Sequence, residues 1–214
     1  MKDARLSPLD QLLVGADRVL RTLYGAPQGT GRTNPADERG HSDLAEAERR
    51  RSGRLMRVNL AGEVAAQALY HGQATTARNP ATAARLRHAA EEENDHLIWC
   101  RERLAALQTP ASRLNPFWYA GAFALGALAG AVGDRVSLGF LEETEHQVVE
   151  HLSGHLERLP ESDEGSRRVL RQMRVDEAHH GMSARAAGGE RPPVPIRFAM
   201  KLASRVMTTT AYWL

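Results

Sequence analysis

A pattern of glutamate and histidine that occurs twice is the feature that most constrains the fold of this chain. The copies are Glu63 with Glu93-x-x-His96, 30 residues later, and Glu145 with Glu177-x-x-His180, 32 residues later. A Glu and a His three positions apart on a helix lie on the same face, so one metal ion can contact both. If both copies meet, four helices must surround one centre: two carry a Glu-x-x-His pair each, and two carry a single Glu each.

Helix signals divide the chain at places consistent with that arrangement. Asn79-Pro80 and Asn115-Pro116 each combine a capping side chain with a proline suited to the first helical turn, and Pro160 ends a helix. The expected helices run over 54–77, from 80 to about 107, over 116–159 with an interruption near 130–133, and from about 162 to 187. No stretch alternates with period two, so the predicted class is all-α, without a sheet.

The flanking segments add one helix at each end of the bundle. Residues 6–24 have the pattern of a short amphipathic helix, and 196–214 that of a terminal helix. Residues 25–53 are rich in Gly, Pro, Asn and charge, which predicts a long polar connection with one helical stretch near 42–51. A length of 214 residues fits a single domain, so we expect residues 1–214 to form one unit.

The carboxylates of the pattern fall where inward-facing apolar residues belong. Glu93, for example, continues a seam that includes Ala90 and Leu97. Burial of a lone carboxylate costs several kcal/mol or forces it to take up a proton. A single Glu-x-x-His would be an ordinary solvated face, but two copies in register favour a metal site. The predicted ligands are Glu63, Glu93, His96, Glu145, Glu177 and His180.

Neighbouring residues leave some choices open. Glu142 lies one turn before Glu145, and we choose Glu145 because its spacing to Glu177 mirrors the first half. His151 and His155 are either outer partners of the site or polar packing residues. Three other acidic residues are expected to be solvated surface charges: Glu91, Glu92 and Asp95.

The donor set indicates which metal and which chemistry to expect. Carboxylates with one imidazole per ion suit iron or manganese, and the thiolates of a structural zinc site are absent from the pattern. Iron is favoured because such a set leaves positions open for dioxygen. Hydroxylation, desaturation and ferroxidase chemistry all fit the spacing.

A family resemblance narrows these alternatives. Its motifs are Asn59-Leu60-Ala61-Gly62-Glu63, Glu93-x-x-His96, Glu142-Glu143-Thr144-Glu145 with His151 and His155, and Asp176-Glu177-Ala178-His179-His180-Gly181. Together they resemble the bacterial demethoxyubiquinone hydroxylases of ubiquinone biosynthesis. The resemblance implies a ferritin-like four-helix bundle with two iron ions per chain. It also implies hydroxylation of a polyprenylated 3-methyl-6-methoxy-benzoquinol by O2.

The resemblance also implies roles and partners. Glu63 and Glu145 would be terminal ligands, Glu93 and Glu177 bridging ligands, and the imidazoles would come from His96 and His180. Either NADH or a separate reductase would supply electrons, and other ubiquinone-biosynthesis proteins are candidate partners. Two other functions stay open on the residues alone: a ferritin-like iron-oxidising or storage protein, and a non-catalytic membrane-associated helical bundle.

Two segments predict contact with a membrane that holds the quinol. Residues 117–132 are uncharged but too short to span a bilayer comfortably, and a buried core helix is the alternative. Residues 196–214 carry Arg197, Lys201 and Arg205 on one face and end in aromatic residues, as interfacial helices do. A helix docked on the bundle is the alternative there.

Charge and cysteine content bound the location and the partners. The net charge of +2 gives no reason to expect nucleic acid as a partner. The single cysteine cannot form an internal disulfide, which suits a reducing compartment, and no secretory signal peptide is expected. We therefore expect a peripheral protein on the cytoplasmic face of the cell membrane.

Overall fold

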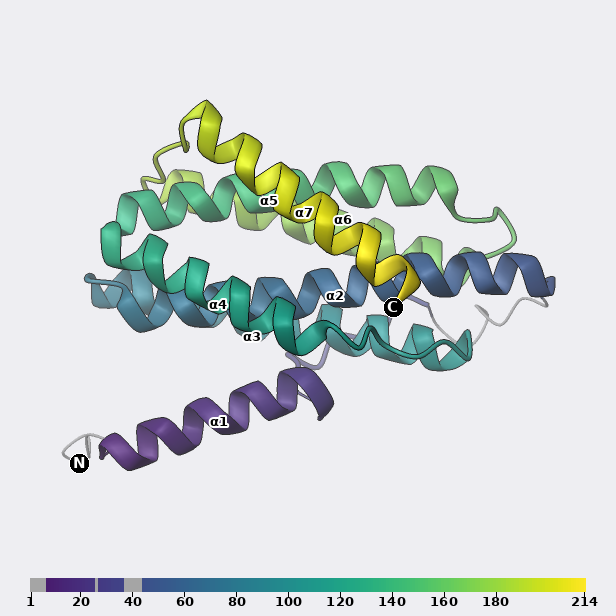
Figure 1. The fold of residues 1–214 in the computed structure, drawn as a ribbon, viewed down its shortest axis with the longest axis horizontal. Helices are drawn as coiled ribbons and strands as arrows, with labels where there is room; N and C mark the ends of the chain where they lie inside the picture. Colours follow the sequence, from purple (N-terminus) through teal and green to yellow (C-terminus); the bar gives the residue numbers. More distant parts are fainter. Residues whose placement is uncertain (1–6, 26, 37–43) are drawn as a thin grey trace.

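The computed structural model describes residues 7–25, 27–36 and 44–214, and the regular structure within them is entirely helical (Figure 1). The helices are α1 (Pro8–Tyr24), α2 (Glu46–Thr76), α3 (Pro80–Ala106), α4 (Asn115–Val132), α5 (Asp134–Arg158), α6 (Glu164–Ala186) and α7 (Val194–Trp213). The predicted all-α class is confirmed. In the described part of the chain, no helix is both long and apolar enough to cross a membrane.

Four of these helices form the bundle. α2 packs against α3, and α5 packs against α6, so each pair contains one copy of the Glu/His pattern. α4 lies against α2 and leads into α5, α7 crosses the bundle diagonally, and α1 lies at its edge (Figure 1). The expected four-helix bundle with an additional helix at each end is confirmed.

Helix boundaries follow the capping signals of the sequence. The side chain of Asn79 accepts a hydrogen bond from the backbone N–H of Ala81 at 2.9 Å, at the start of α3. Gly133, with φ of 152°, separates α4 from α5, as the predicted interruption required. The carboxylate of Asp134 then accepts from the backbone N–H groups of Arg78 and Asn79 at 3.0 and 2.8 Å. The α4–α5 junction is thereby fixed to the α2–α3 turn.

The helical stretch expected near 42–51 is present from residue 46, but it is continuous with the next helix, because α2 runs from Glu46 to Thr76 without a break. The predicted end of the connection at residue 53 is therefore wrong. This first part of α2 is polar but made of strong helix formers, and its charges pair along one face, as Arg50 does with Glu46 at 3.4 Å. Ser52 and Gly53 are already buried there. Polarity alone therefore did not indicate a loop. Residues 42 and 43 of the expected helical stretch lie outside the described part.

Of the two alternatives for 117–132, the structure does not support the buried core helix, because α4 is a surface helix. Phe117 and Leu128 are 72% and 63% exposed. The inner side of α4 instead brings its backbone against that of α2. A Cβ on Gly126 would lie 2.3 Å from the carbonyl oxygen of Leu69, and one on Gly72 would lie 2.2 Å from that of Phe123. The small residues of α4 therefore serve close packing on one side only.

Replacement of Gly126 by alanine tests this contact. The added methyl group must push α4 away from α2, and we expect Gly126→Ala to lower the free energy of unfolding by about 1–3 kcal/mol in urea titrations. Gly121→Ala is the matched control on the same helix, since a Cβ there meets no atom within 4 Å. It should be neutral or slightly stabilising. Equal losses in both variants would contradict direct backbone packing at Gly126.

Candidate metal centre

The structure brings the six predicted ligands to one place inside the bundle. α2 contributes Glu63, α3 contributes Glu93 and His96, α5 contributes Glu145, and α6 contributes Glu177 and His180. Each is buried, with at most 8% of the residue exposed. Among the described residues, one ligand atom from each of Glu63, Glu93, His96 and Glu177 lies within 4.8 Å of the others.

Two of the carboxylates each face both imidazoles. Glu93 places one oxygen 2.8 Å from Nδ1 of His96 and its other oxygen 2.8 Å from Nδ1 of His180. Glu177 does the same at 3.2 and 3.4 Å. Glu63 lies on the His96 side, 3.6 Å from the same Nδ1 atom. This is the arrangement that a pair of ions bridged by two carboxylates would require.

The second single glutamate is held by a tyrosine. The hydroxyl of Tyr70 donates to Glu145 at 2.7 Å, and both residues are buried. Glu142, one turn earlier, is half-buried and lies 3.4 Å from Arg185 near the surface. Of these two glutamates, Glu145 therefore faces the centre. Tyr70 was not predicted as a partner of the site. The available signal was its spacing, since positions 63, 66 and 70 are three and four residues apart and therefore lie on the same face of the helix.

Charge compensation is the main electrostatic property of the centre. Burial raises the pKa of Glu63 and of Glu145 well above the usual range. Burial lowers the pKa of His180, but hydrogen bonds to Glu177 and Glu93 outweigh it and raise that pKa to about 12. The protein by itself thus holds so many carboxylates together only by adding protons. Bound cations would perform the same neutralisation.

Unpaired polar atoms also fit a metal. Buried polar atoms normally have hydrogen-bond partners, because burial without one costs free energy. In the described residues, five buried atoms of this cluster have no well-directed hydrogen bond, although two of them, Glu93 Oε1 and His180 Nδ1, lie 2.8 Å apart: Glu63 Oε2, Glu93 Oε1, Glu145 Oε2, Glu177 Oε2 and His180 Nδ1. All are atoms that would coordinate. Oxygen-rich donors with one imidazole per ion match iron or manganese.

Each imidazole is also held from behind by an acidic side chain. Nε2 of His96 lies 3.0 Å from Asp176, and Nε2 of His180 lies 3.2 Å from Glu92. A proton on Nε2 leaves the lone pair of Nδ1 directed at the carboxylate cluster. Glu92 was expected to be a surface charge; its side chain is 38% exposed, but it also contacts His180, which the sequence did not predict. Both acidic residues directly precede the glutamate that begins a Glu-x-x-His motif. An acidic residue at this position is therefore part of the repeated pattern in the sequence.

The expectation for Asp95 is wrong, whereas Glu91 is exposed as predicted. Asp95 is only 2% exposed, because it accepts two hydrogen bonds from Thr30 in the segment before α2. His155 hydrogen-bonds to Asn59 at 2.9 Å, and its ring contacts that of His151, with centroids 3.9 Å apart and ring planes tilted by 56°. These contacts are those of polar packing residues.

Metal binding should depend on the central carboxylates. We expect anaerobic addition of Fe²⁺ to raise the midpoint temperature of thermal unfolding. At a free Fe²⁺ concentration a hundred times the dissociation constant, the free energy of unfolding should rise by about 2.7 kcal/mol. Glu177→Ala should abolish this shift and leave the purified protein without iron. Glu91→Gln, on an exposed carboxylate of α3, should bind iron as the parent does. Two irons per chain in Glu177→Ala would exclude the bridging role.

Comparison with known proteins identifies the family to which the whole chain belongs. The profile of the family described as ubiquinone biosynthesis protein COQ7 matches residues 50–211. The 3-demethoxyubiquinol 3-hydroxylase of Nitrosococcus oceani is 52% identical over 214 residues, which is 100% of both chains. That of Cupriavidus pinatubonensis is 56% identical over 206 residues, 95% of this chain and 99% of the relative. The predicted resemblance is confirmed, and the chain belongs to the COQ7 family of ubiquinone biosynthesis proteins.

Proposed function

We propose that this protein is a di-iron monooxygenase that hydroxylates a polyprenylated 3-methyl-6-methoxy-benzoquinol with O2. The name of its relatives, 3-demethoxyubiquinol 3-hydroxylase, supports this substrate. The observation that carries the proposal is an apolar cavity whose walls include two of the candidate ligands, Glu63 and Glu177. A cavity of that kind gives an apolar substrate direct access to the metal centre.

The cavity has a volume of about 300 Å³ and lies between α2, α4, α5 and α7. Its walls are mainly apolar and include Ala66, Leu69, Ala122, Val148, Leu152 and Met207. Leu125, which is 49% exposed, also lines it, so the cavity reaches the surface beside α4. An aromatic ring fits the inner end, and an isoprenoid tail can leave through the apolar outer end.

Polar groups along one wall can orient the ring. Asn59, Thr144, Gln147 and His151 line the cavity together with the two carboxylates. Burial lowers the pKa of His151 to about 4, so its imidazole is neutral at physiological pH and can exchange hydrogen bonds with a quinol hydroxyl. The apolar remainder of the wall excludes water from the reacting carbon.

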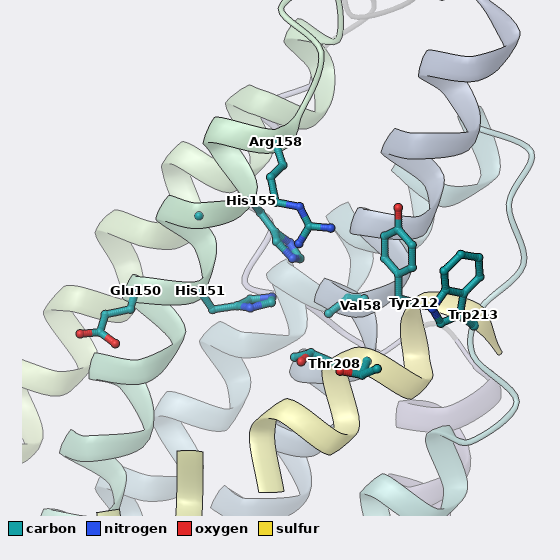
Figure 2. A pocket seen from close by; sticks show the side chains of 10 residues that line it. Val58, Glu150, His151, His155, Arg158, Thr208, Tyr212 and Trp213 are labelled. Carbon is teal, nitrogen blue, oxygen red and sulfur yellow. The ribbon is translucent and has the colours of Figure 1, made fainter. Parts of the chain in front are cut away.

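A second pocket of about 430 Å³ adjoins this cavity between α5 and α7 (Figure 2). His151 and His155 point into it from α5, and Thr208 and Tyr212 lie opposite on α7, with Trp213 beyond Tyr212 (Figure 2). Its lining shares three residues with that of the apolar cavity: Val58, His151 and Thr208. We assign it as a side pocket that adjoins the apolar cavity at His151.

The reaction balances with the components that the proposal names. Two iron ions held by Glu63, Glu93, His96, Glu145, Glu177 and His180 would supply the activation of O2. One oxygen atom of O2 is inserted into the ring C–H bond to give C–OH, and the other leaves as water, with two electrons and two protons from a donor. NADH and a separate reductase are the two candidates for that donor. The residues of the cavity orient the ring, exclude water from it and offer it uncharged hydrogen-bond partners.

Exposed apolar side chains around the cavity favour a membrane-bound quinol over a free substrate. They gather on α4 and α7, the helices that flank the cavity, and include Phe117, Leu125, Leu128, Phe198, Leu202 and Val206. A soluble iron-storage cage would not expose such a surface to water. We therefore propose a peripheral location on the cytoplasmic face of the cell membrane, with other ubiquinone-biosynthesis proteins as candidate partners.

Turnover of the quinol is the decisive test. Iron-loaded protein supplied with demethoxyubiquinol, a reductant and O2 should yield a product heavier by one oxygen atom in mass spectrometry. Ala66→Phe should fill the cavity and reduce this rate at least tenfold, which is about 1.4 kcal/mol of barrier, while iron content stays unchanged.

The matched control is Ala120→Phe, because Ala120 is an exposed residue of α4 that does not line the cavity. It should leave the rate close to that of the parent. Iron oxidation without a hydroxylated product would instead favour the iron-storage function.

The membrane proposal predicts binding to lipid vesicles. Phe198→Asp and Leu202→Asp each place a charge on the exposed apolar side of α7, where the side chains are 70% and 55% exposed. Both variants should sediment with vesicles of phosphatidylglycerol and phosphatidylethanolamine several-fold less than the parent. Val175→Asp is the control, since Val175 is 60% exposed but lies on α6. An equal loss in all three variants would contradict a specific membrane face.

A further inference from the structure

The segment of residues 27–36, here called the strap, lies against the outer side of the metal centre without regular secondary structure. Thr30 donates to Asp95 of α3 from its backbone N–H at 2.8 Å and from its hydroxyl at 2.5 Å. The side chain of Asn94 donates to the backbone carbonyl of Gln28 at 2.9 Å. A Cβ on Gly29 would lie 2.2 Å from Oδ1 of Asp95, so only glycine permits this close approach.

One side chain of the strap reaches the group that holds a candidate ligand. Nη2 of Arg32 lies 2.6 Å from Oδ2 of Asp176, the same oxygen that lies 3.0 Å from Nε2 of His96. The guanidinium of Arg32 also lies over the ring of Trp99, 4.8 Å from its centroid. The ring of Trp99 is in turn 5.4 Å from that of His96. Arg32 is therefore connected to His96 through both a carboxylate and an aromatic ring.

The other imidazole has a different environment. Nε2 of His180 lies 3.2 Å from Glu92, and the second described ion-pair partner of Glu92 is the exposed His88, at 4.0 Å. The side chain of Glu92 is 38% exposed, whereas that of Asp176 is 16% exposed. The two halves of the centre thus share a His–carboxylate contact, but an arginine of the strap fixes the carboxylate in only one of them.

We propose that Arg32 is a positioning residue of the metal centre, which holds Asp176 so that His96 keeps its proton on Nε2 and presents Nδ1 to a metal ion. This inference rests on the proposed metal centre. The strap precedes residues 50–211, which the family profile matches, but lies inside the 214 residues aligned with the relative from Nitrosococcus oceani.

The charges of this group agree with that role. The cationic guanidinium of Arg32 lies 2.6 Å from Oδ2 of Asp176, so the attraction of opposite charges holds this carboxylate beside His96. Gln172 donates to the other oxygen of Asp176 at 2.9 Å, which fixes the plane of the carboxylate. Loss of Arg32 would free one oxygen to turn toward water, and the Nε2 hydrogen bond of His96 would weaken.

Cobalt-substituted protein gives a direct readout of the two imidazoles. Bound Co²⁺ shifts the exchangeable imidazole N–H protons far from the main proton NMR spectrum, so His96 and His180 should each give one resolved signal. The signal that Glu92→Gln alters identifies His180. We expect Arg32→Met to accelerate solvent exchange of the His96 signal at least threefold and to leave the His180 signal unchanged. The Co²⁺ dissociation constant should rise about three- to tenfold, somewhat less than for direct partners of a ligand.

Three further variants decide between positioning and a general structural role. Gly29→Val should lift the strap and reproduce the effect on His96, and Arg32→Lys should restore part of it. Arg171→Met removes an exposed arginine paired with Glu164 on the same helix as Asp176, and it should change neither signal.

An unchanged His96 signal in Arg32→Met would overturn the proposal, and so would equal changes in both imidazole signals. Failure of the parent protein to bind cobalt or iron would instead refute the metal centre itself, and the inference with it.

Discussion

The burial of four carboxylates at one point is the constraint on which the rest of the structure depends. Each sits on an inward helix face where an apolar side chain would have stabilised the bundle, so the centre weakens the core that surrounds it. Two imidazoles and raised pKa values compensate for part of the charge within the protein, and metal ions would compensate for the rest. The buried apolar residues on the inward faces of the same helices stabilise the fold instead. Leu97, Cys100 and Leu104 of α3, for instance, are at most 3% exposed.

The same constraint explains why access to the centre is narrow and apolar. Water at the carboxylates would lower the free-energy cost of their burial. It would also occupy the space of the substrate and allow side reactions. Direct backbone contact between α2 and α4 at Gly72 and Gly126 fixes the spacing of two helices whose residues line the cavity. The outer face of α4 is free of this packing and exposes Phe117 and Leu128 beside the opening. One helix thus closes the bundle on its inner side and presents an apolar surface on the other.

The sequence predicted those parts of the structure that depend on the periodicity of a single helix. Glu93, Glu145 and Glu177 are buried because each continues a seam of its own helix, and that seam is readable without a partner. Glu92 and Asp95 were assigned to the surface because they lie off the seam of α3. Their partners come from elsewhere: His180 lies 88 residues from Glu92, and Thr30 lies 65 residues from Asp95. Helical periodicity contains no information about such contacts.

The two copies of the pattern are alike in sequence, but their surroundings are not. Glu145 has a tyrosine hydroxyl as a partner, whereas Glu63 forms a wall of the substrate cavity and faces His96. His96 is held by a carboxylate that itself receives an arginine and a glutamine, and His180 by a half-exposed glutamate. In the proposed centre, the duplicated ligand set would therefore hold two metal ions with different neighbours. The proposed reaction of O2 with the ring takes place on one side of the pair, and the different neighbours would distinguish that side from the other.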